Sequence, residues 1–322
     1  MMIGQIRGRR GIALVLVLWV ITLLTVMALG LTAAQRTETA LTLNALDGAR
    51  FRAAAEAGVS YAVLNLLASR NLDPDVLQTD AQGRSTAWLP DGSAHRWTFS
   101  EVPLVISVQN EASRIDLNLA DVDLLTTLFL VLNVPEADAW ALADRILDWR
   151  DPDDLTGLNG AEDPDYAAAG LPYGAKDGPF DSVEELRQVL GVTQDLYALL
   201  APEVTVDTGE SRPDEQFASA VVLAALTGLT LEDAQLSVAE RNQPPLPGAA
   251  PQGAGGGGPL YRIRVARAAA GTDQAMVADP ETVPASVGLA METLVRVEPG
   301  TSPPVSVMWR RYGLVSQPGP AL

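Results

Sequence analysis

Residues 7–36, "RGRRGIALVLVLWVITLLTVMALGLTAAQR", decide the organisation of this chain, because arginines precede an uncharged apolar run from Ile12 to Ala34. As a helix rising about 1.5 Å per residue, this run is long enough to cross a bilayer core of about 30 Å. Arginines favour the cytoplasmic side of a membrane, so we expect the residues after 34 to lie outside it. The sequence therefore predicts a single transmembrane helix over 12–34 and an external head.

A secretory signal that is removed after export is the first alternative for this run. Such signals have an apolar core of about 7–15 residues, followed by a small-residue cleavage site. Ala28-Leu29-Gly30 would serve as that site, and the chain would then start near Leu31. The run is longer than this class of signal needs, which favours a helix that is kept.

A second alternative combines processing with retention of the helix. The string "RRG" followed by "IALVLVLW" resembles the leader of prepilins, which prepilin peptidase cuts after glycine on the cytoplasmic side. The resemblance implies a leader over 1–11, cleavage between Gly11 and Ile12, and methylation of the new amine. The whole apolar helix would then remain on the mature protein.

The fifth residue of this mature chain would be Leu16, where pilins and most pseudopilins carry Glu. In such fibres the Glu is thought to pair with the N-terminal amine of the next subunit. An unpaired carboxylate in an apolar bundle is costly, and a subunit at the tip has no neighbour ahead of it. The resemblance therefore makes Leu16 a marker of the large K-type minor pseudopilin of type II secretion.

The composition narrows the function classes. The 322 residues carry a formal net charge of −18, which argues against a nucleic-acid partner because phosphate binding needs clustered Lys and Arg. Cysteine is absent, so disulfides and thiol chemistry are excluded. His95 is the single histidine, and no Gly-x-Ser-x-Gly string occurs, so we expect no enzyme. Trp140 and Trp149 stand beside apolar residues in helical stretches and are predicted to be core.

Beyond the apolar run, the pattern predicts a continued helix and then strands. Residues 35–69 keep a helical period, with one apolar face formed by Phe51, Ala55, Val59, Val63 and Leu66. Alternating or β-branched stretches predict two strands within 94–109 and three more at roughly 260–267, 291–297 and 304–310.

Between these strand regions lies a block, residues 110–241, that is mainly helical with acid-rich loops. The Pro- and Gly-rich residues 242–259 are predicted to be a linker. Strands on both sides of the block indicate an insertion. The fold class is therefore α+β: a pilin-like long N-terminal helix packed on an antiparallel sheet, with a large inserted helical domain.

The block contains strings that resemble the K-type minor pseudopilins, chiefly "ALADRILDWRDPDD", "NGAEDPDY" and "LPYGAKDGPFDSVEELRQVLGVT". The resemblance implies an inserted domain similar to SAM or helix-hairpin-helix domains. It also implies a tip subunit that helps initiate the pseudopilus with I- and J-type minor pseudopilins and the inner-membrane assembly platform. Such a protein supports export of folded proteins across the outer membrane, and sits in the Gram-negative inner membrane as a single-pass protein with a periplasmic head.

On this resemblance the chain divides into eight segments. They are the leader (1–11), the transmembrane helix (12–34), its amphipathic continuation (35–69), the first strands of the head (70–109), the inserted domain (110–241), the linker (242–259), the last strands of the head (260–313) and a tail (314–322).

The block also resembles helix-hairpin-helix modules, which bind the DNA backbone through a Gly-apolar-Gly turn. The corresponding stretch here, "LVLNVPEADA", lacks those glycines and lies among acids. DNA binding is therefore disfavoured.

Seven carboxylates between 148 and 165 form an acidic cluster with a single arginine, Arg150. So many like charges repel one another unless water or a cation screens them. Calcium takes 6–8 oxygens and tolerates irregular loops, and the family resemblance implies calcium in this domain. A solvated acidic loop is the alternative. The candidate calcium ligands are Asp148, Asp151, Asp153, Asp154, Glu162, Asp163 and Asp165.

Two other function classes stay open at this point. One is an exported acidic binding protein with a cleaved signal, and the other is a membrane-tethered, calcium-binding adhesin or scaffold. The mature N-terminus separates the first from a pseudopilin, and association with I- and J-type partners separates the second.

Overall fold

The computed structural model of the protein describes residues 10–71, 88–242, 257–268, 288–298 and 300–315. Most of the leader, the linker and the tail expected from the sequence lies outside these residues. The chain divides into two compact units, Met1–Ala53 and Ala54–Leu322, and each is described by itself.

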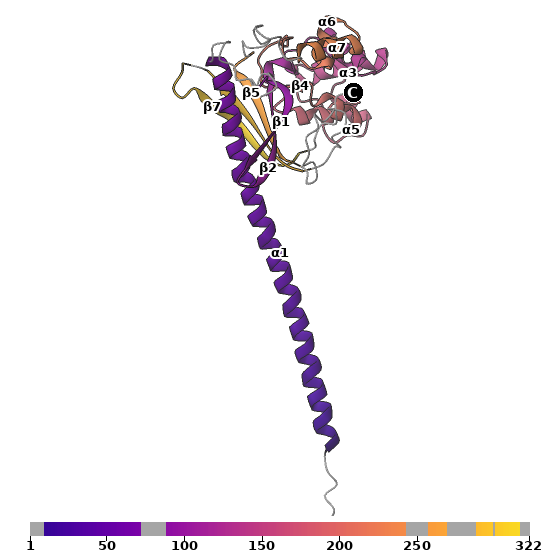
Figure 1. Cartoon of the computed structure of the whole chain (residues 1–322). Coiled ribbons are helices and arrows are strands. Elements are labelled where there is room, and N and C mark those ends of the chain that lie inside the picture. The colour runs from indigo at the N-terminus through magenta and orange to yellow at the C-terminus, as the bar shows by residue number, and fades with distance from the viewer. Residues whose placement is uncertain (1–9, 72–87, 243–256, 269–287, 299, 316–322) are drawn as a thin grey trace, which may run out of the picture. The chain divides into compact units, whose positions relative to one another are not determined.

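The described part of the first unit belongs to helix α1, which runs from Arg10 to Asn71 (Figure 1). Its large apolar side chains between Leu14 and Leu31 are 46 to 74% exposed. The hydroxyl of Thr22 donates to the carbonyl of Trp19 at 2.8 Å, so this polar group is satisfied within the helix itself.

Within the described residues, no single helix has both the length and the apolar character needed to cross a membrane. The apolar part of α1 counts as a shorter helix, Leu14–Leu29. Two helices, Ala220–Thr227 and Leu231–Arg241, are joined at a bend of 120°. They meet the requirement only when taken together, by length and composition alone.

The second unit is built on a five-stranded antiparallel sheet, in the order β1-β2-β5-β6-β7 (Figure 1). Each strand predicted from the sequence is present; the strand predicted at 260–267 matches β5, and the other strands differ from their predicted bounds by up to five residues. The strands are Asp91–Phe99 (β1), Val102–Asn110 (β2), Leu260–Arg267 (β5), Gly288–Val297 (β6) and Val305–Val315 (β7).

The part of α1 that belongs to the second unit packs on this sheet. Ala55, Val59 and Leu66, from the predicted apolar face, are buried. A Cβ added at Gly58 would lie 3.1 Å from Val265 and 3.3 Å from Ile106, so helix and sheet approach closely at the position that has no side chain. The predicted α+β class, with a long helix on an antiparallel sheet, is confirmed.

The helical block is inserted between two neighbouring strands. β2 ends at Asn110, which pairs directly with Tyr261 near the start of β5. The chain therefore leaves the sheet and returns to it at one place. A short parallel ladder, β3 (Ile115–Asp116) with β4 (Val204–Thr205), closes the block near this point.

The block has its own apolar core, to which most of its helices contribute. Buried members include Leu128 and Phe129 of α2, Ile146 and Trp149 of α3, and Tyr166 of α4. The helices gather beside the sheet in Figure 1. They are α2 (Val122–Val131), α3 (Glu136–Arg150), α4 (Asp163–Ala168), α5 (Gln194–Leu200), α6 (Ala220–Thr227) and α7 (Leu231–Arg241), with short 3-10 turns η2 (Glu111–Ser113) and η3 (Val183–Gln188).

The two tryptophans of α3 differ in burial. Trp149 is 3% exposed and belongs to the core, as predicted, but Trp140 is 38% exposed. The core prediction for Trp140 is therefore wrong. Ala139, Ala143 and Ile146 define the buried stripe of α3 at helical spacing, and Trp140 lies off that stripe.

Candidate functional site

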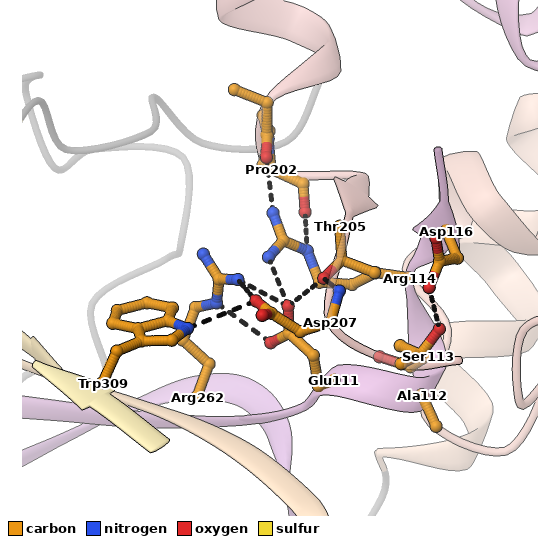
Figure 2. Close-up of polar contacts among 12 residues, drawn as sticks. Glu111, Ala112, Ser113, Arg114, Asp116, Pro202, Thr205, Asp207, Arg262 and Trp309 are labelled. Atoms are coloured by element: carbon orange, nitrogen blue, oxygen red, sulfur yellow. Dashed lines mark hydrogen bonds and ion pairs between the residues drawn. The ribbon is translucent and has the colours of Figure 1, made fainter. Parts of the chain in front are cut away.

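A buried carboxylate, Glu111, occupies the junction between the sheet and the helical block. It follows β2 directly, and its side chain is fully buried. Arg262 of β5 donates to both of its oxygens, from Nε to Oε2 at 2.9 Å and from Nη2 to Oε1 at 2.5 Å. Arg114 and Thr205 donate to Oε1 at 3.1 and 2.5 Å. Figure 2 shows these donors converging on Glu111 from the sheet and from the block.

The charges around Glu111 decide its ionisation. Burial alone would raise the pKa of this carboxyl, because a charge is less stable away from water. The guanidinium groups of Arg262 and Arg114, together with the hydrogen bonds, outweigh that effect and lower the pKa of Glu111 to about 2. The group is therefore a carboxylate at every physiological pH.

A second layer of contacts surrounds this ion pair. Arg262 lies 3.6 Å from Asp207 of the block, and its guanidinium stacks 5.1 Å from the ring centre of Trp309 on β7. The indole Nε1 of Trp309 donates to Asp207 at 3.3 Å (Figure 2). Arg114 donates to the backbone carbonyls of Ala201 and Pro202, the latter at 2.9 Å. Nε, Nη1 and Nη2 of Arg114 and Nε and Nη2 of Arg262 thus all donate within the junction.

The chain re-enters the sheet at Gly257, in a conformation that glycine favours. Its φ is +62°, and a Cβ there would lie 1.9 Å from Nδ2 of Asn110. At the rim, Arg311 of β7 and Glu184 of η3 form an ion pair at 2.6 Å between half-exposed side chains. The junction is thus a buried polar network whose ion pairs and hydrogen bonds hold the block to the sheet.

The second feature is the acidic loop, residues 151–162, which follows α3. Asp148 of α3 is 3% exposed and accepts hydrogen bonds from the backbone N–H groups of Gly157 and Ala161, at 3.0 and 2.8 Å. Asp144, one turn earlier, accepts from the backbone and side chain of Asn159, each at 3.0 Å. α3 therefore holds the loop by two carboxylates.

The structure separates the seven predicted calcium ligands into different roles. Asp148 and Glu162 are buried, Asp151 is half-buried, and the others are exposed. Asp153 accepts from Leu155 N at 2.9 Å, and Asp165 accepts from Glu162 N at 3.0 Å in the capping box of α4. Among the described residues, no three His, Asp or Glu side chains are grouped so that they could hold one metal ion.

Glu162 is the exceptional member of this set. It is 2% exposed, and its Oε1 atom has no hydrogen-bond partner within the part of the chain that the structure describes. Burial first, and then the charges of Asp148, Asp177, Asp151 and Asp154, raise its pKa to about 7. Asp177, which sequence spacing did not suggest, is brought to the cluster by the fold.

The cations that stand near these acids in the sequence are engaged elsewhere. Arg150 donates to the carbonyls of Leu117 and Ala120, the latter at 2.7 Å. Lys176 pairs with Asp181 and Glu185 at 2.7 and 2.8 Å. The cluster therefore carries an uncompensated negative charge, with one buried oxygen that a cation would satisfy.

The remaining predicted residues lie on α1. Gly11 and Ile12 are in its first turn, and the side chain of Ile12 is outside the described ones, while Leu16 is 62% exposed.

His95, on β1, packs face to face on Trp88 with ring centres 4.2 Å apart, and burial lowers its pKa. Within the described residues, His95 therefore has a packing role.

Comparison with known proteins identifies a family domain and similar chains. Residues 105–208 match the domain described as type II secretion system (T2SS), protein K. The chain is 28% identical over 254 residues to a type II secretion system protein K of Klebsiella pneumoniae, covering 70% of this chain and 73% of that protein. It is 27% identical over 240 residues to the protein of that name from Pseudomonas aeruginosa, covering 68% of each.

The fold is similar to that of a chain in the crystal structure of the GspK-GspI-GspJ complex from the enterotoxigenic Escherichia coli type 2 secretion system. The TM-score is 0.50 at 18% identity, covering 81% of this chain and 97% of that one. At this identity the likeness concerns the fold.

Proposed function

Because residues 105–208 carry the domain of type II secretion system protein K and the chain is related to proteins of that name along most of its length, we propose that it is a minor pseudopilin that caps the tip of the pseudopilus. The family domain is the observation that carries this proposal. The role is one of shape and placement, with no catalysis, and it supports export of folded proteins across the outer membrane.

The junction at Glu111 supports a capping role. Capping by bulk requires that the inserted block cannot swing aside from the sheet. A fully buried carboxylate, held by two arginines and a threonine from both bodies, meets that requirement. Leu16 fits the same position, since a subunit with no neighbour ahead has no amine with which to pair a carboxylate.

We propose further that the chain assembles with I- and J-type minor pseudopilins and starts fibre assembly on the inner-membrane platform. The similar fold in a complex of three such proteins supports this proposal. Co-purification of the full-length chain with its I- and J-type partners tests it. A chain that stays alone in the presence of both would favour the tethered scaffold instead.

Maturation is proposed to follow the prepilin route. Prepilin peptidase would remove residues 1–11, leave Ile12 as the methylated N-terminus and keep the chain in the inner membrane with its head in the periplasm. The intact mass and N-terminal sequence of the native protein test this directly. A start near Leu31 would identify an ordinary secretory signal and would contradict the tip role.

Calcium is proposed to bind at the acidic loop. The unpartnered Oε1 of buried Glu162 and the uncompensated carboxylates around it support a cation there, although no ready-made group of three carboxylates is present. Calcium accepts backbone carbonyl and water oxygens as well, so Glu162 and Asp148 would hold it together with such oxygens. Bound calcium would supply the positive charge that this cluster lacks.

The melting temperature of the full-length chain in detergent, with calcium, magnesium or chelator, tests this proposal. Calcium that binds only the folded state must raise the melting temperature, and Glu162→Gln should remove most of the rise. Identical melting with calcium and with chelator would leave the loop as a solvated acidic loop.

A further inference from the structure

Two leucines on the acidic loop are exposed to an unusual degree. Leu158 is 96% exposed and Leu155 is 77% exposed, the highest values among the large apolar side chains that the structure describes. Single exposed apolar residues are common, but two such side chains three residues apart on one loop are left almost without apolar contacts in their own chain. We call Leu155 and Leu158 the leucine knuckle.

The knuckle stands on a turn that is held in place. Backbone donors on both sides of Leu158, at Gly157 and Asn159, bond to Asp148 and Asp144 of α3, at 3.0 Å each. The N–H of Leu155 donates to Asp153 at 2.9 Å. These bonds fix the turn without any cation. A protrusion that is already ordered loses little conformational freedom on binding, which is the property that strengthens a docking element.

Charge around the knuckle determines what kind of surface it fits. Residues 151–175 contain no Lys or Arg, and the exposed Asp153 and Asp154 directly precede Leu155 in the sequence. A second copy of this chain would place acids against acids at this contact, and an anionic lipid surface would be repelled for the same reason. The exposed carboxylates are Asp153, Asp154, Asp163 and Asp165.

We propose that the leucine knuckle docks into an apolar socket bordered by lysine or arginine on a partner protein. The leucines supply the buried apolar contact, and the carboxylates orient the approach and exclude other partners. The site lies in the helical block and shares no residue with the contacts of the Glu111 junction, so docking there need not disturb the joint between block and sheet.

The test rests on the proposed secretion function. A strain that lacks this chain is complemented with the parent or with Leu155→Asp/Leu158→Asp, and exported protein in the medium is measured. We expect the double variant to lower export by about tenfold or more, the loss that removal of one interface hot spot causes. Leu236→Asp, at a leucine that is 60% exposed on α7, is the matched control and should export like the parent.

Co-purification of the full-length double variant with I- and J-type partners shows which protein carries the socket. Lost export with the three-protein complex intact puts the socket on an exported protein or on the outer-membrane channel, and loss of the complex puts it on an I- or J-type partner. Either result supports the proposal. Unchanged export together with an unchanged complex would overturn it.

A charge variant tests the chemistry of the socket. Asp154 is exposed and accepts no hydrogen bond within the described residues, so Asp154→Lys should leave the loop folded and still reduce export. Full export by Asp154→Lys would overturn the basic border. If deletion of the whole chain left export unchanged, the proposed function itself would fail, and this outcome differs from every result of the knuckle variants.

Discussion

Glu111 is a fully buried carboxylate of the second unit that is paired with two arginines. Its carboxylate pairs with two arginines that are themselves removed from water. Removing one partner of a buried ion pair leaves uncompensated charge in the interior, which costs more than the pair contributes. A substitution of Glu111 is therefore the most direct test of how strongly the joint stabilises the second unit.

We predict that Glu111→Gln lowers the free energy of unfolding by about 3–5 kcal/mol, because two buried guanidinium groups lose the carboxylate that they share while the shape is kept. Glu184→Gln is the matched control, since it breaks a half-exposed ion pair and should cost about 0–1 kcal/mol. Denaturant unfolding of the full-length chain in detergent, followed by tryptophan fluorescence, measures both. Equal midpoints for the two variants would contradict the role of the junction.

The raised pKa of Glu162 predicts that the stability of the folded protein falls as pH rises. Its folded pKa of about 7 lies above the ordinary value of 4.5, so the folded protein holds the proton more tightly than the unfolded chain. The stabilising contribution is complete below pH 4.5 and is lost as pH rises through 7. Without calcium, the melting temperature of the parent should therefore fall over this range.

Glu162→Gln should flatten that fall and melt higher than the parent at pH 8 in chelator. Glu210→Gln, an exposed acid on a loop of the same block, is the control and should follow the parent curve. Thermal melts from pH 4 to 8 provide the comparison. A parent melting temperature that does not change between pH 5 and 8 would show that Glu162 is not held in its acidic surroundings.

At the scale of elements, the acidic loop depends on glycine beside Asp148. A Cβ at Gly160 would lie 1.8 Å from Oδ2 of Asp148, the oxygen that accepts from Gly157 and Ala161. The side chain that holds the loop and any side chain at position 160 therefore compete for one space. The loop conformation follows from this pairing between α3 and the turn.

We predict that Gly160→Ala costs about 1–3 kcal/mol of stability, because Asp148 is displaced and the backbone donors that it satisfies lose their acceptor. Gly178→Ala is the control, since its added Cβ would meet only one atom, at 3.8 Å. Unfolding free energies of both variants test this. Gly160→Ala should also weaken export if the leucine knuckle needs an ordered turn.

At the scale of the whole molecule, the second unit is a sheet interrupted at one point. Asn110 and Tyr261 are direct partners in neighbouring strands, so the sheet itself does not require the chain between them. The block, in turn, has a separate apolar core. A sheet and a block with a core of its own, linked by a polar joint, are expected to fold as partly independent units.

We predict that replacing residues 111–260 with an Asn-Gly turn leaves a folded sheet, because Asn110 and its partner Tyr261 would then flank a two-residue hairpin turn. Arg262 would then lack Glu111, so Arg262→Thr belongs in the same variant. The circular dichroism spectrum of the shortened chain should keep its strand signal, while export should be lost because the block is absent. Complete unfolding of the shortened chain would show that the block is part of the sheet's own stability.

The sequence alone determined the order of elements. The uncharged run, the apolar stripe with Val59 and Leu66, and the alternating strands are periodic over neighbouring residues, and periodicity is a local property that survives in the unfolded chain. The position of the block between strands followed from the same patterns. Trp140 shows the limit, because an apolar neighbourhood in sequence does not say which side of a helix is covered.

Only the tertiary structure decided which charges are buried and with what partners. Glu111 and Arg262 are separated by 151 positions, and Asp177 joins Glu162 from a different loop. The ionisation of a carboxylate depends on burial and on charges within a few ångströms of it, and neither is encoded in spacing along the chain. The joint, the unpartnered oxygen and the exposed leucine knuckle all arise from contacts that exist only once the block has folded.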